Sequence, residues 1–547
     1  MAVKTVETAD GLKQRQQTLG SLRLRHHETN EIILIPAPSD ESRPYRYYLA
    51  ILLSLAIFFS NFLAAGPTVS MVEVTTDFFG PPGPTFEANI AKASYFFTTT
   101  ALLQGMSNLI WMPLIVKYGR RPIYVTSFIL YTACAAWAGG ATSYGSELAA
   151  RIIMGAAAGA SETLAPLTIS DIFFLHERGS IMAMYTCFLG AGVGGGILIC
   201  GLVSISLDWR YGYWIAVALI GCATVLIVFT FPETEFDRPA AVVSDSDSIR
   251  DVEYRKGADF EAHVETVAAA GSPARSGSGS HRPHAPPPPR RSFAQRLSLF
   301  SGVHTQESLA KLFWRPVVML ALPPILWATL VMAVTIGFLV AITSNFASAF
   351  STAYGFAPYQ AGLCFIASIL GSLIGIFFGG HFSDWVADFF TRRNGGVREP
   401  EFRLPAIMIS VVTGPLALVL YGEGIGLRLH WMCATIGLGL LNFSIVQATN
   451  VSLVYTIDAY RPVAGEVTVT QLAFKSAFGF LLSFYTNPWI ARDGYERAFG
   501  AMAGISGAVL LGWIPFYLFG KRIRHATWQW GFVRKMAHWD QDREVGE

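Results

Sequence analysis

Long apolar stretches alternate with short polar segments along most of the chain. A membrane-spanning helix needs about 20 mostly apolar residues, and the chain contains twelve stretches of that kind. The first six lie near residues 47–71, 92–115, 121–142, 145–170, 180–205 and 211–231, and the second six lie near 316–342, 357–380, 403–422, 429–455, 466–490 and 498–519. This pattern predicts an all-α membrane protein with twelve transmembrane helices in two pseudo-symmetric six-helix bundles.

A polar segment separates the two sets of spans. It is rich in Ser, Gly and Pro, and it contains four consecutive prolines that begin at Pro286. Such a composition cannot bury a hydrophobic core, so we predict a disordered cytoplasmic linker that acts as a tether or, alternatively, as a phosphorylated regulatory loop. Residues 292–312 mix basic with apolar residues, which is typical of a helix on the inner leaflet. The predicted domains are a tail at 1–46, a bundle at 47–235, the linker at 236–313, a bundle at 314–520 and a tail at 521–547.

The distribution of charge supports insertion in a membrane and gives an orientation. Only 14% of the residues are charged, against about 25% in soluble proteins. Basic residues gather at 117–121, at 381–403 and at the start of the C-terminal tail, whereas the loops 72–91, 143–147 and 343–356 have none. The positive-inside rule therefore predicts cytoplasmic termini. We expect the plasma membrane, with a vacuolar or other internal membrane as the alternative, and we expect no nucleic-acid partner. The net charge of +2 is too small to bear on nucleic-acid binding.

Arg151, Glu162 and Lys475 are charged residues that fall inside predicted spans. Charged residues are rare there and mark substrate or proton pathways. Glu162 lies eleven residues after Arg151, which is about three helical turns along the same face. We predict that Glu162 is the protonatable group, because a carboxylate in low-dielectric surroundings can take up a proton near neutral pH. The alternatives are a structural pair between Arg151 and Glu162, and a structural pair between Lys475 and Asp458.

Amide side chains and closely spaced glycines complete the candidate residues within the spans. The amides expected to line a cavity near the membrane midplane are Asn61, Gln104, Asn108, Asn442, Gln447 and Asn450. Small residues let neighbouring helices approach closely. The glycines predicted to pack helices are Gly155, Gly159, Gly190, Gly194, Gly371, Gly375 and Gly379.

The cysteines and histidines give no sign of catalytic or metal chemistry. All six cysteines fall inside apolar stretches without a CxxC pair, so neither disulfides nor zinc are predicted. The histidines avoid the centres of the apolar stretches, which weighs against a membrane enzyme with a buried catalytic histidine. We expect no enzymatic activity, no cofactor and no metal.

Several short motifs occur at the ends of the predicted spans. They are Lys117-Tyr-Gly119-Arg120-Arg121 after the second span, Arg151-x-x-x-Gly155-x-x-x-Gly159 in the fourth, Pro232-Glu233-Thr234 after the sixth, Gly380-x-x-x-Asp384 after the eighth and Glu399-Pro-Glu401-Phe-Arg403-Leu before the ninth. In this order, they resemble a major facilitator superfamily transporter of the fungal branch of the 12-spanner drug:proton antiporter family. The family signature is Gly-x-x-x-Asp-Arg/Lys-x-Gly-Arg-Arg, and here Met112 and Val116 replace its Gly and Asp.

The resemblance implies the major facilitator fold and a secondary active transporter that works by alternating access. It implies proton-coupled efflux of a small organic molecule, such as a drug, a toxin or a secondary metabolite, with Arg151 assisting the coupling. The residues expected at a cytoplasmic gate are Lys117, Gly119, Arg120, Arg121, Asp171, Arg178, Glu233, Asp384, Glu399, Glu401, Arg403 and Asp458. Because Val116 replaces the acidic residue of the first turn, Asp171 is the first candidate for its acidic partner. The expected partners are the substrate, protons and the lipid bilayer, and the protein is expected to be monomeric.

The direction of transport stays open at this point. The antiporter motif of the family contains Gly-Pro in the fifth span, whereas residues 180–205 contain no proline. The main alternative is a proton symporter that imports a nutrient or a polyamine. An importer of cations would need several carboxylates in its cavity, and Glu162 alone is clearly predicted there. A transporter-like sensor or a membrane enzyme fits the sequence less well.

Overall fold

The computed structural model describes residues 22–23, 43–234 and 297–531, apart from positions 82, 84, 85, 174, 299, 301, 304, 306, 461, 462 and 529. Most of the predicted linker and of both predicted tails therefore lies outside the described residues. We call residues 43–234 the first half and residues 297–531 the second half.

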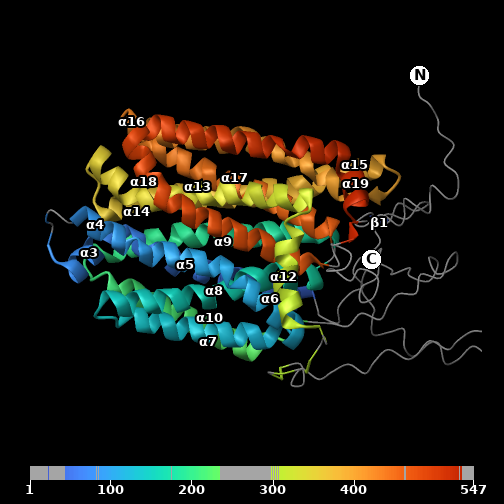
Figure 1. Cartoon of the computed structure of the whole chain (residues 1–547), viewed down its shortest axis with the longest axis horizontal. Helices are drawn as coiled ribbons and strands as arrows, with labels where there is room; N and C mark the ends of the chain where they lie inside the picture. Colours follow the sequence, from blue (N-terminus) through green and yellow to red (C-terminus); the bar gives the residue numbers. More distant parts are fainter. Residues whose placement is uncertain are drawn as a thin grey trace, which may run out of the picture. The chain divides into compact units, whose positions relative to one another are not determined.

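The first half consists of long helices that run back and forth beside one another (Figure 1). They are α2 (Arg43–Ala65), α3 (Met71–Phe79), α4 (Phe86–Ala93), α5 (Tyr95–Met106), α6 (Asn108–Tyr118), α7 (Arg120–Gly139), α8 (Tyr144–Ile172), α9 (Leu175–Val203) and α10 (Arg210–Thr230). The 3-10 turn η1 (Gly66–Ser70) connects α2 to α3, and α5 and α6 together form one apolar segment, Tyr95–Tyr118.

The second half repeats this arrangement. Its elements are α12 (Leu309–Met319), α13 (Pro323–Tyr354), α14 (Pro358–Ile376), the π-helical turn η3 (Phe377–Phe382), α15 (Ser383–Arg393), β2 (Val397–Arg398), the 3-10 segment η4 (Pro400–Ile407), α16 (Met408–Gly426), α17 (Trp431–Ala459), α18 (Ala464–Leu511) and α19 (Trp513–Trp528). The two-residue strand β1 (Leu22–Arg23) pairs antiparallel with β2.

The predicted all-α membrane fold is confirmed. Eleven helical segments of the described chain are long and apolar enough to cross a membrane. The last segment, Ala464–Thr527, has 64 residues, far more than the roughly 20 that one span needs. Its helix is interrupted at Gly494, where φ is 80° and ψ is 166°. The last two of the twelve predicted spans fall on either side of this break.

The largest departure from the prediction is at the start of the second half. The predicted span 316–342 is divided between α12 and α13, because the chain leaves the helix after Met319 and Pro323 starts a new one. α12 begins at Leu309, within the range predicted as linker. Within the predicted leaflet helix at 292–312, the described residues are helical only from Leu309 onward.

Several predicted packing glycines lie where two helices nearly touch. A Cβ at Gly155 or Gly159 would overlap the α5 backbone at Thr100 and Gln104, and a Cβ at Gly371 would overlap the α17 backbone at Gly439. At the remaining predicted positions, Gly190, Gly194, Gly375 and Gly379, a Cβ would lie between 2.7 and 3.3 Å from a neighbouring helix. Small residues are thus placed where the helices approach most closely.

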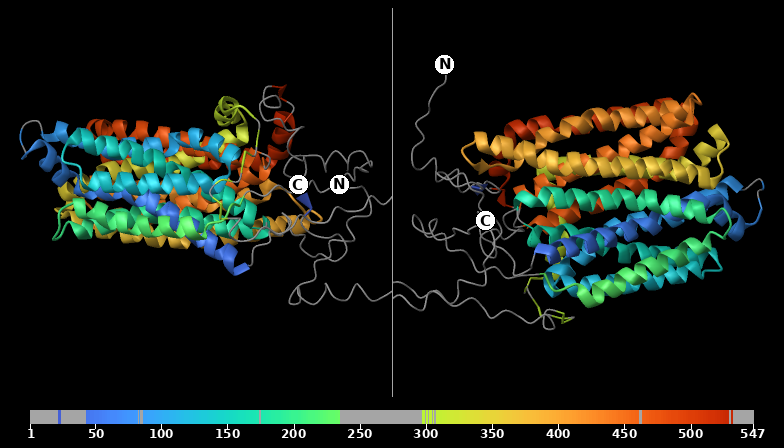
Figure 2. Two further views of the ribbon diagram at one scale, coloured as in Figure 1. Left: turned by 90° about the horizontal axis from the view of Figure 1, so that it is seen from below. Right: turned by 180° about the vertical axis from the view of Figure 1, so that it is seen from behind.

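Two pairs of helices make the largest contacts between the two halves. α9 packs on α14, as the view from behind shows (Figure 2), and α5 packs on α18. A Cβ at Gly105 of α5 would overlap Ser476 of α18, so these helices are in direct contact at this point. We call the end of the spans that holds the Lys117–Arg121 turn and the 393–403 loop the basic end.

Candidate functional site

A small cavity lies between the two halves. It has a volume of about 70 Å³, and residues of α2, α5, α8, α9, α13, α17 and α18 line it. A water molecule needs about 10–15 Å³ measured in this way, whereas drug-sized ligands occupy pockets of about 300–1,000 Å³. The cavity therefore has room for a few water molecules, and a drug-sized ligand would fit only if it widened.

A buried ion pair crosses this cavity from one half to the other. The Lys475 Nζ of α18 lies 3.1 Å from the Glu162 Oε2 of α8, and the two side chains are 6% and 2% exposed. The pairs suggested from the sequence, Lys475 with Asp458 and Arg151 with Glu162, are therefore wrong. Packing of α18 on α5 brings Lys475 to Glu162, and a single helix sequence does not reveal such packing.

Side chains of the first half hold Glu162 in place. Gln104 Nε2 donates to Glu162 Oε1 at 2.7 Å and to Asn61 Oδ1 at 3.3 Å. The Tyr185 hydroxyl donates to the Glu162 backbone carbonyl at 3.1 Å. Both Glu162 carboxylate oxygens thus have a partner, one from its own half and one from the other.

The cavity extends from the ion pair away from the basic end. α2 starts at the basic end, where Arg43 lies 3.9 Å from Glu177, and α13 starts there too, directly after α12. The cavity residues Ala65 and Thr343 lie further along these helices than Asn61 and Ile336. α5 runs the other way, and Phe97, near its start, also lines the cavity. The ion pair therefore lies at the end of the cavity that is nearest to the basic end, and the cavity extends from it toward the opposite end of the spans.

The remaining predicted amides do not line the cavity. Asn108 and Asn442 donate to the carbonyls of Gln104 and Leu438, each four residues earlier in the same helix. Gln447 donates to the Ala406 carbonyl of η4 at 2.5 Å. An amide in an apolar span can donate to a backbone carbonyl of its own half, so residue type alone did not separate these residues from Asn61 and Gln104.

Asn450 lies instead where the halves meet at the basic end. Its amide donates to the Gly179 carbonyl of α9 at 3.3 Å and to the Gly379 carbonyl of η3 at 2.6 Å. A Cβ at Gly380 would lie 3.0 Å from Ser180 Cα, so backbones of the two halves approach closely. The cavity is therefore closed toward the basic end.

The first basic turn is held by acidic residues of neighbouring segments. Gly119 adopts φ 90° and ψ 178°, a conformation that favours glycine. Arg120 forms an ion pair with Asp171, the partner expected from the sequence. The Glu233 carboxylate accepts from the backbone N–H groups of Arg120 and Arg121 at 3.1 and 3.2 Å. A carboxylate at the start of α7 also complements the helix dipole.

The second turn uses the opposite arrangement of charge. Asp384 at the start of α15 lies 2.7 Å from Arg403 and 3.7 Å from Arg398, which both follow it in the chain. The Ser180 hydroxyl of the first half donates to Asp384 at 3.4 Å. In the second turn an acidic residue has basic partners, whereas in the first turn the basic residues have acidic partners.

The remaining predicted gate residues lie at the same end. Arg524 of α19 is fully buried and lies 3.1 Å from Glu399 and 2.8 Å from Glu401. Lys117 is partly buried, and Asp458 is buried. The Arg178 side chain lies outside the described residues.

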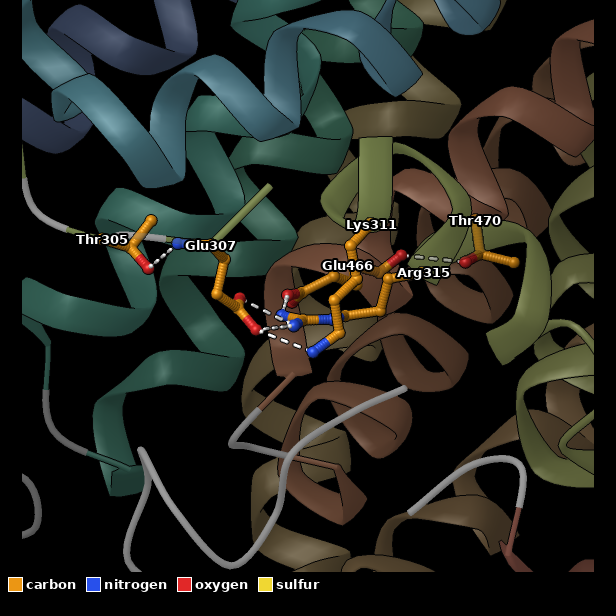
Figure 3. Close-up of polar contacts among 6 residues, drawn as sticks. All are labelled: Thr305, Glu307, Lys311, Arg315, Glu466 and Thr470. Carbon is orange, nitrogen blue, oxygen red and sulfur yellow. Dashed lines mark hydrogen bonds and ion pairs between the residues drawn. The ribbon is translucent and has the colours of Figure 1, made fainter. Parts of the chain in front are cut away.

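Sequence reasoning missed an ion cluster on α12. Arg315 is 3% exposed and lies 2.7 Å from Glu307 and 3.0 Å from Glu466 at the start of α18 (Figure 3). Lys311 also approaches Glu307, at 3.2 Å. Burial raises the pKa of Glu307, but the charges of Arg315 and Lys311 outweigh burial and lower it below its ordinary value. α12 contacts both α6 and α18 and therefore joins the two halves at the basic end.

A second missed residue is Glu147, the partner of Arg151. Arg151 Nε lies 3.3 Å from Glu147 Oε1, and an Arg151 guanidinium N–H donates to the Leu63 carbonyl at 2.6 Å. The Tyr213 hydroxyl donates to Glu147 at 2.5 Å. All four residues belong to the first half. The spacing of four between Glu147 and Arg151 was the signal in the sequence that could have revealed this pair.

Known transporters resemble this chain along most of its length. The model of the Major Facilitator Superfamily matches residues 49–483. The uncharacterized MFS-type transporter C1271.10c of Schizosaccharomyces pombe is 24% identical and covers 91% of this chain and 89% of its own length. The MFS transporter cpaT of Aspergillus oryzae is 26% identical over 80% of each chain. Among solved structures, the proton:xylose symporter XylE matches 89% of this chain and 100% of its own, with a TM-score of 0.59 and 13% identity.

Proposed function

Because the chain belongs to the Major Facilitator Superfamily, we propose that it exports a small organic molecule in exchange for protons, by alternating access. It is a multi-pass membrane transporter and not an enzyme. The observation that carries the proposal is the Glu162–Lys475 pair, which joins the two halves within the cavity. In alternating access the two halves rock around a central site, and a pair that spans them has to form and break in each cycle.

The buried charges of the pair link this movement to protons. Separation of the two side chains in a narrow cavity leaves each charge without its partner, at a cost of several kcal/mol. A change of protonation or a charged substrate removes that cost. Coupling then follows, because the movement is favourable only when the charge in the cavity remains balanced.

The contacts at the basic end supply the gate in this proposal. Arg120–Asp171 and Asp384–Arg403 each lie within one half, so they fix the ends of the spans. The contacts that break on opening are those between halves: Ser180 with Asp384, and Asn450 with Gly179. The ion pairs predicted as a gate therefore shape the two surfaces that separate.

Export, orientation and location rest on separate arguments. We propose that both termini are cytoplasmic, which the positive-inside rule supports, and the cavity is then directed outward. Export follows the resemblance to the drug:proton antiporters, and we propose a monomer in the plasma membrane. Import of a nutrient in symport with protons is the competing direction.

A comparison of metabolites inside and outside cells tests the function. Cells with the protein should hold less of the substrate inside and more outside than cells without it, and a collapsed proton gradient should remove the difference. The Glu162→Gln variant, matched for abundance in the membrane, should behave like cells without the protein. Accumulation inside cells would establish import instead, and no change in any metabolite would contradict transport of a small organic molecule.

A further inference from the structure

We infer that the proton exchanged for substrate is carried by the Lys475 ammonium, and that the substrate is an organic cation that replaces Lys475 at Glu162. The inference rests on the proposed exchange of protons for substrate, and it assigns the proton to an amine rather than to the carboxylate. The sequence alone favours Glu162 as the protonated group.

The hydrogen bonds around Glu162 are those of an ionised carboxylate. Its Oε1 accepts from Gln104, and its Oε2 lies 3.1 Å from the Lys475 ammonium. A carboxylic acid would need an acceptor for its O–H group, and both of these neighbours present N–H groups. Because Gln104 and Tyr185 belong to the first half, this acceptor site persists when Lys475 leaves with the second half.

The charge balance of the cavity determines what can replace Lys475. Glu162 and Lys475 are the only charged residues among the described residues that line it, so its net charge is zero. An entering cation raises that charge to +1 unless a cation leaves, and unbalanced charge in a water-poor cavity is costly. If Lys475 gives its proton to cavity water, the amine becomes neutral and the balance is restored.

The exchange conserves atoms and charge. The N–H bond of the ammonium breaks, its electron pair stays on nitrogen, and the proton leaves with water. The substrate cation then forms the ion pair with Glu162 that Lys475 formed before. In each of these two states the cavity contains one cation and one carboxylate, so its net charge is zero and the protein can change conformation with the cavity closed. With two cations, or with none, the cavity carries a net charge and the protein cannot make this change.

Among the described residues around the Glu162–Lys475 pair, Lys475 is the group that can release the proton. α2 contributes Asn61, α5 contributes Gln104 and α9 contributes Tyr185, whose hydroxyl is directed to a backbone carbonyl. The cavity residues of α13 and α17 carry no titratable side chain among those described. An anionic substrate would pair with Lys475 and leave Glu162 unbalanced, whereas a monovalent organic cation preserves the balance.

Proton release on cation binding tests the inference. The full-length protein in lipid nanodiscs is titrated with tetraethylammonium, whose fixed charge cannot itself supply protons, in weakly buffered solution with a pH indicator. Wild type should release about one proton per bound cation, by charge balance. Lys475→Arg should release none, because arginine stays charged, and Glu162→Gln should not bind the cation. Binding without release in wild type, or release from Lys475→Arg equal to wild type, would overturn the inference. Absence of binding in wild type would overturn the assignment of a cation.

A second measurement applies if the arginine variant does not fold. Infrared difference spectra of wild type and Glu162→Gln, between about pH 5 and pH 8, should show no protonated carboxyl band that belongs to Glu162. Such a band would place the proton on the carboxylate. That result would leave the proposed proton-coupled export intact, whereas failure of the metabolite comparison would remove it. The two failures are therefore distinguishable.

Discussion

Glu147–Arg151 and Glu162–Lys475 are both buried ion pairs, and they differ in which parts of the molecule they join. Glu147–Arg151 has a separation of 3.3 Å and side chains that are 1% and 3% exposed. Glu162–Lys475 has a separation of 3.1 Å and side chains that are 2% and 6% exposed. The first pair lies on one helix, α8, whereas the second joins α8 to α18 across the two halves.

This difference separates a structural role from a transport role. A pair within one half moves with that half and can persist through the whole cycle. A pair between the halves has to break whenever they separate. We therefore propose that nearly the same chemistry stabilises one bundle at Glu147–Arg151 and responds to protons and substrate at Glu162–Lys475.

Neutralisation of the pair between the halves should have the largest effect on transport. Glu162→Gln removes the partner of Lys475, and a buried charge without its partner costs about 3–5 kcal/mol. We expect proton-driven export to fall to background, measured in cells with equal amounts of protein in the membrane. Glu162→Asp keeps the carboxylate and should keep part of the activity. Export that remains pH-dependent in Glu162→Gln would exclude a role of this residue in coupling.

Neutralisation of the pair within the first half should affect stability instead. Glu147→Gln leaves Arg151 without its carboxylate, so we expect the free energy of unfolding to fall by about 3–5 kcal/mol. The pH dependence of export by the remaining folded protein should not change. The double variant Glu147→Gln/Arg151→Met should be more stable than Glu147→Gln, measured by thermal unfolding in detergent. A shifted pH profile without a loss of stability would contradict the distinction between the two pairs.

The first basic turn should have an intermediate effect. In Arg120→Ala/Arg121→Ala the ion pair with Asp171 is lost, although the backbone bonds to Glu233 can still form. We expect export to drop severalfold at normal abundance in the membrane. Lys117→Ala, which removes a charge from the same turn but none of these contacts, is the matched control. Unchanged turnover in the double variant would leave the turn with a role in topology alone.

The α12 cluster should give the smallest effect, visible as a dependence on pH. Because the pKa of Glu307 is lowered in the folded protein, the ionised carboxylate stabilises docking of α12 at neutral pH, and this contribution is lost as the pH falls below the ordinary value of 4.5 toward the folded-state pKa. Hydrogen exchange of α12 amides should therefore become faster in acid. In Arg315→Met the acid dependence should weaken. Equal acid dependence in both proteins would exclude Glu307 as its source.

The fold could be predicted from the sequence because the length and apolarity of a span are local properties. Twelve apolar stretches and the basic turns between them sufficed for the architecture. Prediction failed at α12, a separate helix that begins at Leu309 and contains the first residues of the predicted span 316–342. The composition before it is typical of a linker, and the packing of α12 on α6 and α18 decides its structure instead.

The candidate site could be predicted only in part. Glu162, Lys475, Asn61 and Gln104 were identified because polar residues are rare in spans, and all four line the cavity. Their partners could not be predicted, because pairing depends on how α5, α8 and α18 are rotated against one another. For the same reason, the residue type of Asn450 did not reveal whether this residue joins the two halves at the basic end or lines the cavity.

A structure of the protein with tetraethylammonium bound, determined by electron cryomicroscopy, tests the central claim most directly. The account predicts the cation against the Glu162 carboxylate, with Lys475 Nζ moved from 3.1 Å to beyond ion-pair distance. A bound cation beside an intact Glu162–Lys475 pair would contradict it.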